Sequence, residues 1–116
     1  MKTRTLLTAC AVVCASAIAQ TANYTGVEAA KHVGETATVT DKVDGVHQAR
    51  KGHIFLNMGG KYPNQAFTAF IPAASASKFP EVRQYEGRTV TLSGKIVIYR
   101  GKPEIVVNSP SQISSK

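Results

Sequence analysis

Hydrophobic and polar residues alternate with a period of two along most of this chain, which is the pattern of half-buried β-strands. The alternation recurs in five stretches separated by segments containing glycine, proline or asparagine. The five predicted strands span residues 36–43, 53–58, 66–71, 89–99 and 104–108. In the fourth and clearest strand, the inward side carries Val90, Leu92, Ile96 and Ile98. Its outward side carries Thr89, Thr91, Ser93, Lys95 and Tyr99.

Two short segments have a helical pattern instead. Thr25 stands three residues before Glu28, the spacing of a capping box, and apolar residues follow as far as Gly34. We therefore expect a helix of about two turns within residues 25–33, closed by Gly34 in a left-handed conformation. The segment 72–84 lacks alternation, and its alanine and serine content predicts a second short helix between two prolines.

The first and fourth predicted strands resemble each other. Residues 34–43 align without gaps onto residues 87–96. One interpretation is that the two strands have equivalent roles, each beginning at a glycine and bending at Asp41 or Gly94, as strands do at the corner of a small barrel. The other is that two threonine-rich strands resemble each other by chance.

The first nineteen residues have the pattern of a secretory signal peptide. Lys2 and Arg4 precede an apolar run at 6–18, and Ala17-Ile18-Ala19 has the small residues of a cleavage site. The run of about 13 residues is too short to span a bilayer, so a retained anchor is the weaker interpretation. Lipid attachment at Cys10 is a further alternative. The pattern predicts a periplasmic or secreted protein with no membrane span after cleavage.

Removing this leader changes the composition of the protein. Both cysteines, Cys10 and Cys14, leave with it, so the exported chain has no thiol to form a disulfide or bind a metal. The formal net charge falls from +7 to +5. The remaining length of about 97 residues is enough for one modest core. It excludes doubly wound nucleotide-binding folds and α/β barrels.

The order of three strands, a short helix and two strands resembles that of OB-fold domains of the anticodon-binding and single-strand nucleic-acid-binding type. The stretches 90–96, 99–107 and 109–113 are similar to the end of such domains. The resemblance implies an all-β fold with short helices, in which residues 34–113 form a five-stranded Greek-key barrel. A lead-in and short helix (20–33) would precede the barrel, and a tail (114–116) would follow it.

The same resemblance implies a binding face. In such domains the ligand lies across the second and third strands, between the loop joining strands one and two and the loop joining strands four and five. Here these loops are 48–52 and 99–103, which we expect to lie on one side of the barrel around a single groove. The candidate ligand-binding residues are Arg50, Lys51, His53, Phe55, Lys95, Tyr99, Arg100 and Lys102.

The types of these residues suit a polyanion. Cations neutralise phosphates, and aromatic rings such as those of Tyr99 and Phe55 stack on bases. The alternative is that solvated turns attract lysine and arginine without binding anything, and that an outward Phe55 or Phe70 is covered by other parts of the chain.

Catalytic and metal-binding patterns find little support in the sequence. His32, His47 and His53 lack the spacing of a ligand set, and the carboxylates are scattered. We expect no metal and no cofactor, and a non-enzymatic protein that binds single-stranded nucleic acid or another anionic polymer. The alternative is an envelope or secreted interaction module that uses the same face for a protein partner. A nuclease relative is a weaker third interpretation, because Asp41 and Asp44 are the only close acidic pair.

Overall fold

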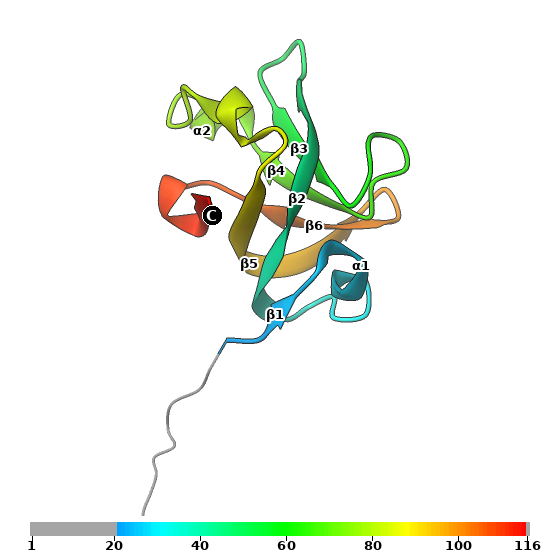
Figure 1. Ribbon diagram of the computed structural model, residues 1–116. Helices are drawn as coiled ribbons and strands as arrows, with labels where there is room; N and C mark the ends of the chain where they lie inside the picture. The colour runs from blue at the N-terminus through cyan, green and yellow to red at the C-terminus, as the bar shows by residue number, and fades with distance from the viewer. Residues whose placement is uncertain (1–20, 116) are drawn as a thin grey trace, which may run out of the picture.

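Seven strands and several short helical turns make up the fold, which a computed structural model describes for residues 21–115 (Figure 1). The predicted signal sequence lies outside the described residues. The elements in chain order are β1 (Asn23–Tyr24), α1 (Gly26–Ala29), β2 (Thr36–Gln48), β3 (Ile54–Met58), β4 (Phe67–Ile71), α2 (Ala73–Ala76), the 3-10 helix η1 (Val82–Tyr85), β5 (Thr89–Tyr99), β6 (Lys102–Val106), the 3-10 helix η2 (Pro110–Gln112) and β7 (Ile113–Ser115).

Five of the strands close into a barrel, in the order β2-β3-β4-β6-β5, with β5 pairing back onto β2. All neighbouring pairs in the barrel are antiparallel except β4 and β6, which run parallel. The predicted five-stranded barrel is thus confirmed. Two short strands that the sequence did not predict extend it, β1 beside β2 and β7 beside β5. The predicted tail therefore begins within a strand.

The two segments of similar sequence pair with each other to close the barrel. The antiparallel register joins 36–42 of β2 to 89–95 of β5, and Val39 pairs with Leu92, its own counterpart in the alignment. The Gly34 N–H donates to the Ile96 carbonyl, and the Gly87 N–H donates to the Val43 carbonyl, both at 2.7 Å. These two hydrogen bonds exchange under the alignment, so the closing ladder has local two-fold symmetry.

The bends of these two strands differ. Gly94 has φ +155, and a Cβ there would lie 2.8 Å from Ile105 Cγ2. Next to it, β5 changes its partner from β2 to β6, which confirms the bend predicted at Gly94. The bend predicted at Asp41 is wrong, because the irregularity of β2 falls between Val43 and Gly45. The Asp41 carboxylate instead accepts the Gly26 N–H at 2.9 Å, which holds α1 against the barrel.

The core agrees with the predicted alternation. The largest fully buried side chains include Leu56, Met58, Phe67, Leu92 and Ile96. Burial of a side chain of this size contributes about 1.5–3 kcal/mol. Ile98, predicted to face inward, is instead 50% exposed, because β6 pairs with β4 only over residues 104–106 and the β5–β6 hairpin projects beyond the barrel.

The two predicted helices are shorter than expected. The capping box of Thr25 and Glu28 is present, and Gly34 has φ +97, as predicted. However, α1 makes only one turn, and the chain continues to Gly34 through turns. The predicted helix in 72–84 is two separate turns, α2 and η1, with Pro80 between them. Proline provides no N–H and its ring obstructs the preceding turn, which accounts for the interruption.

Candidate ligand-binding face

A row of aromatic rings crosses the outer face of β2, β3 and β4. His47 pairs with Phe55, and Phe55 pairs with Phe70. The ring centroids of His47 and Phe55 lie 6.0 Å apart, and those of Phe55 and Phe70 lie 5.3 Å apart. Both phenylalanines are half-buried, whereas Phe67 on the inner face is fully buried. Phe67 and Phe70, three residues apart on β4, thus face opposite sides of the sheet, as strand alternation requires, and part of the aromatic row is accessible.

His53 extends this row and also has a structural contact. Its ring centroid lies 5.2 Å from that of Phe70. Its Nδ1 atom accepts the N–H of Ala73, at the start of α2, at 3.0 Å. The ring is therefore held in one orientation beside Phe70.

The loop between β2 and β3 places two cations next to the aromatic row. It is closed by hydrogen bonds from the Ala49 N–H to the His53 carbonyl, 2.7 Å, and from the Gly52 N–H to the Ala49 carbonyl, 2.9 Å. Arg50 and Lys51 are exposed, and neither side chain makes a hydrogen bond or ion pair within residues 21–115. Both cations can therefore contact an anionic ligand.

The hairpin between β5 and β6 uses its cations differently. Arg100, with φ +52, lies over the exposed ring of Tyr99, at 5.3 Å from the centroid. The Lys102 ammonium donates to the carbonyls of Pro63, at 2.7 Å, and Gln65, at 2.9 Å. The prediction that Lys102 contacts a phosphate is therefore not supported, because its charge holds the β3–β4 loop in place.

The two cationic loops do not meet around one groove, which corrects the predicted arrangement. The β2–β3 loop precedes Ile54, whereas the β5–β6 hairpin adjoins the β3–β4 loop, which follows Met58. The length of β3, about 13 Å, separates these two ends. Figure 1 shows the β2–β3 loop at the top and the other two loops together at the right. The loops bracket the outer face of β3 and β4 from opposite ends.

Lys95 lies away from this face. It pairs with Thr36 in the ladder between β2 and β5, on another part of the barrel wall. Its assignment as a ligand-binding residue beside Tyr99 is not supported, because the change of partner after Gly94 separates Lys95 from the hairpin.

A row of buried polar residues occupies the middle of the face. The sequence pattern did not predict their burial. Asn57, Thr68 and Glu104 stand in register on neighbouring strands, yet each is 7% exposed or less. Gln65, from the β3–β4 loop, covers them and donates to Thr68 Oγ1 at 3.3 Å. Thr68 Oγ1 in turn donates to Asn57 Oδ1 at 3.3 Å. Strand alternation predicts that such residues face outward, but it carries no signal that a loop covers them.

Burial has an electrostatic consequence in this row. Desolvation by burial raises the pKa of the Glu104 carboxyl above its ordinary value, and no cation lies within ion-pair distance among the described residues to offset it. Gln65 Oε1 is also buried without a hydrogen-bond partner. The Gly59–Ala66 loop thus covers a polar patch that is costly to bury.

A separate cluster holds the N-terminal lead-in. Glu35 accepts hydrogen bonds from the Tyr24 hydroxyl, at 2.6 Å, and forms a 2.7 Å contact with His32 Nδ1. The Tyr24 and His32 rings stack with centroids 3.9 Å apart. The hydrogen bond from Tyr24, followed by that from His32, lowers the pKa of Glu35, and the same bond raises the pKa of Tyr24. These groups, of which Tyr24 and His32 are partly buried, hold β1 against the turn after α1.

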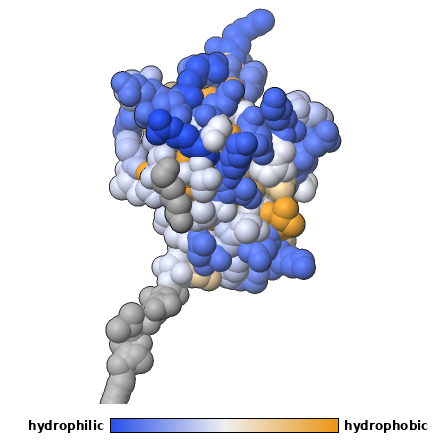
Figure 2. All heavy atoms as spheres, in the orientation of Figure 1, coloured by the Kyte–Doolittle hydropathy of each residue, from blue (hydrophilic) through white to orange (hydrophobic). Residues whose placement is uncertain are grey.

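The visible surface is mostly hydrophilic, with one small hydrophobic patch at the right of the view (Figure 2). The exposed large hydrophobic residues are Val27, Val33, Tyr62, Ile98 and Tyr99. Across residues 21–115, no three His, Cys, Asp or Glu side chains are grouped to hold a metal ion. In the same part of the chain, no helix has the length and apolar character needed to cross a membrane.

Comparison with known proteins supports the fold. No protein-family model matches the sequence, and no curated protein matches it. Among solved structures, a chain described as an aspartyl-tRNA synthetase from Leishmania major Friedlin aligns with a TM-score of 0.56 and 10% identity, covering 91% of this chain and 22% of that chain. At this identity, the similarity shows a shared OB-like barrel fold.

Two further structures are similar over a shorter part of the chain. The first is the aspartyl-tRNA synthetase of Entamoeba histolytica, with a TM-score of 0.49 and 17% identity, covering 72% of this chain and 18% of that chain. The second is the asparaginyl-tRNA synthetase of the same organism, with a TM-score of 0.48 and 18% identity, covering 72% of this chain and 21% of that chain. This chain spans about a fifth of the length of each synthetase.

Proposed function

We propose that this chain is an exported, non-enzymatic OB-fold protein that binds single-stranded nucleic acid across the outer face of β3 and β4. The observation that carries the proposal is an accessible row of aromatic rings next to two exposed cations. The rings are those of His47, Phe55, Phe70 and His53. The cations, Arg50 and Lys51, make no side-chain hydrogen bond or ion pair within residues 21–115. Stacking of one base on an aromatic side chain contributes about 1–3 kcal/mol.

The opposite end of the face provides a second set of contacts. Tyr99 and Arg100 form an exposed cation–π pair, and Tyr62 in the neighbouring loop is 75% exposed. A strand that crosses from the β2–β3 loop to this pair passes over Phe55 and Phe70. Binding by stacking and phosphate contact requires no catalytic group and no metal, in keeping with a non-enzymatic role.

The net charge of the chain after leader removal, +5, favours a polyanionic ligand. The 22% coverage of the first similar synthetase corresponds to one small part of a protein whose described substrate is a tRNA. That similarity is compatible with a nucleic-acid ligand, although it shows only a common fold.

The direct test is a fluorescence anisotropy titration with a labelled single-stranded oligonucleotide at low salt. We expect saturable binding that weakens when Phe55 and Phe70 are replaced by leucine, which retains apolar bulk but cannot stack. Lys95→Ala is the matched control, since it removes a cation from another part of the barrel. The absence of saturable binding would reject the proposal.

The alternative, a protein partner on the same face, has a distinct outcome. Pull-down from an envelope extract would recover one protein despite nuclease treatment, and Phe55→Leu with Phe70→Leu would abolish that recovery. Export is tested separately by expressing the full chain and measuring the mass of the periplasmic product, which should begin at Gln20.

A further inference from the structure

The last three residues of β2, 46–48, have a backbone edge that pairs with no other strand, whereas both backbone groups of Val43 still bond to Gly87 and Arg88 on this edge. Its pairing with β5 ends at Lys42, and residues 43–48 pair with β3 on the other side. Because the Ala49 N–H bonds to His53 of the β3 side, the alternation of an antiparallel ladder directs the backbone groups of Val46 and Gln48 away from β3. The Val46 N–H meets Glu86 Oε1 at 3.3 Å. Within residues 21–115, no hydrogen bond joins the Gln48 backbone to another element on this edge.

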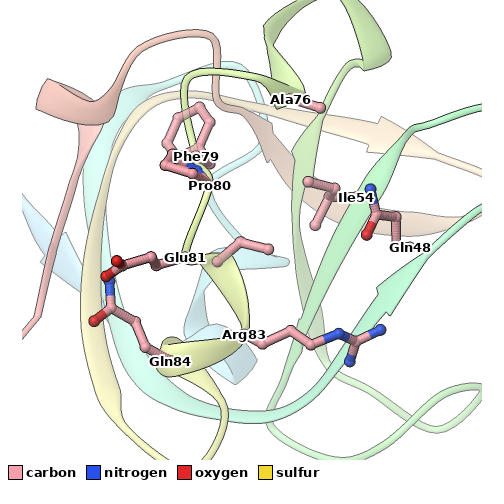
Figure 3. Close-up of a pocket in the computed structure, with 9 residues that line it drawn as sticks. Gln48, Ile54, Ala76, Phe79, Pro80, Glu81, Arg83 and Gln84 are labelled. Atoms are coloured by element: carbon pink, nitrogen blue, oxygen red, sulfur yellow. The ribbon is translucent and has the colours of Figure 1, made fainter.

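A cavity of about 530 Å³ lies beside this edge, between the end of the β2–β3 hairpin and the segment from α2 to η1 (Figure 3). Its apolar lining comes from Ile54, Ala76, Phe79 and Val82. Its volume is in the range of pockets that hold small ligands or a few residues of a peptide. Its lining includes none of His47, His53, Phe55 and Phe70, so the cavity is distinct from the aromatic row on β3 and β4.

Charge at the cavity is asymmetric. Figure 3 shows Arg83 and Gln48 on one side, while Glu81 and Gln84 point the other way. Arg83 is exposed and forms no ion pair within the described part of the chain. Arg50 and Lys51 follow Gln48 along the chain. On the side of β2, three cations without an ion pair, Arg50, Lys51 and Arg83, outnumber the single carboxylate of Glu86, so an acidic group meets a net positive charge there.

We propose that this cleft binds an extended peptide segment of a partner protein, which adds as a strand to the free edge of β2. The edge presents the carbonyl of Val46 and both backbone groups of Gln48, which is the alternate pattern that another extended backbone satisfies, and the added strand replaces Glu86 at the Val46 N–H. Side chains of the added strand that face the same way as Gln48 cover Phe79 and Val82. Acidic side chains between them lie near Arg83 and the β2–β3 loop.

The test uses the ¹⁵N-labelled exported chain and the peptide acetyl-Val-Glu-Val-Glu-Val-amide, followed by NMR up to millimolar peptide. We expect shifts of the amides of Val46, Gln48, Val82 and Arg83. Two control peptides carry N-methyl groups on alternate residues, one at the valines and one at the glutamates. A strand that pairs through one edge uses only alternate N–H groups, so one control should lose about tenfold or more in affinity and the other should bind like the parent.

Two charge-reversal variants of the protein distinguish a loss of binding caused by charge from one caused by misfolding. Arg83→Glu should weaken peptide binding, whereas Arg88→Glu, also exposed but outside the cavity lining, should not. Well-dispersed spectra of both variants show that the barrel is intact. With the peptides, any of three results would overturn the proposal: no shift with the parent peptide, equal binding by both N-methylated peptides, or shifts confined to Phe55 and Phe70. A fourth result concerns nucleic acid. If a single-stranded oligonucleotide shifts the same cleft amides, the cleft belongs to the nucleic-acid face and the peptide proposal fails.

Discussion

Basic residues lie beside both ends of the β3–β4 hairpin, but their contacts differ. At one end, Arg50 and Lys51 lie in an exposed loop and make no side-chain hydrogen bonds within the described chain. At the other end, Lys102 donates to two loop carbonyls, and the loop it holds covers the buried row that includes Glu104. The cations of the first end are therefore available to the proposed ligand. At the second end Lys102 holds a loop in place, and the exposed groups that remain are Tyr62, Tyr99 and Arg100.

This difference shows that a basic residue in a turn is not by itself a binding residue. The Lys102 ammonium already donates two hydrogen bonds within the protein. Arg50 is exposed and makes no such bond in the described part of the chain. Substitutions at each end test whether the two ends separate into a structural and a binding role.

The largest effect is expected from Lys102→Met. The substitution retains the length of the side chain but removes the charged donor, leaving the carbonyls of Pro63 and Gln65 without it. The free energy of unfolding should fall by about 1.5–3 kcal/mol, the contribution of hydrogen bonds to a charged group. Urea denaturation measures it. Arg100→Met, at an exposed neighbour, should change stability by less than about 0.5 kcal/mol; equal losses in both variants would contradict the structural role of Lys102.

Phe55→Leu should produce the next largest effect, this time on binding. Loss of the ring removes stacking but retains apolar contact, so affinity for a single-stranded oligonucleotide should fall about fivefold, corresponding to about 1 kcal/mol. Anisotropy titration measures this change. Tyr62→Leu at the other end should weaken binding less. The roles of the two ends would be reversed if Tyr62→Leu had the greater effect.

Glu104→Gln tests the buried row through its pH dependence. Because burial raises the pKa of Glu104 above its ordinary value of 4.5, the folded chain holds this proton more tightly than the unfolded chain. Stability is therefore lost as the pH rises from below the ordinary carboxyl pKa through the raised one. The variant should lack this loss and be more stable than wild type at neutral pH, as measured by thermal unfolding between pH 4 and 7 (roughly the carboxyl range).

Glu81→Gln, at an exposed carboxyl, provides the matched control for this measurement. Its unfolding curve should keep the pH slope of the wild type. Parallel slopes in wild type and Glu104→Gln would show that the covering loop does not desolvate Glu104.

The smallest effect concerns salt. Arg50→Ala should reduce the slope of log affinity against log salt concentration by about 0.7, the value for one phosphate contact on a single strand. Lys51→Ala should behave alike, and Lys102→Met should leave the slope unchanged. Binding titrations at several salt concentrations measure these slopes. If Lys102→Met reduced the slope as much as Arg50→Ala, Lys102 would contact a phosphate of the ligand.

Local pattern was sufficient to predict much of the barrel. Alternation identified the inward residues of the strands apart from Ile98, and the capping box located the start of α1 at Thr25. Residue spacing could not place the bend of β2, since a bulge between Val43 and Gly45 depends on how two strands register against it.

The candidate site was predicted less completely than the fold. Arg50, Lys51 and Phe55 lie where the resemblance placed them, beside or on the outer face of β3. Lys95 instead lies in the ladder between β2 and β5, and Lys102 donates to carbonyls of a loop 37–39 residues earlier in the chain. Both placements depend on strand pairing and loop packing between distant parts of the chain. Three further residues belong to the candidate ligand-binding face: Phe70, His47 and Tyr62. The sequence signals for them were their aromatic rings and the position of Tyr62 in a turn.

Sequence by itself determined which side chains face the interior, because strand and helix periods are local properties of the backbone. It also determined the excess of positive charge, which depends on composition alone. Tertiary structure alone decided which cations are free, which carboxyl is desolvated and which strand edge is open. Each of those depends on groups distant along the chain, and the free energy of a charge or a backbone donor is set by the neighbours that replace its water.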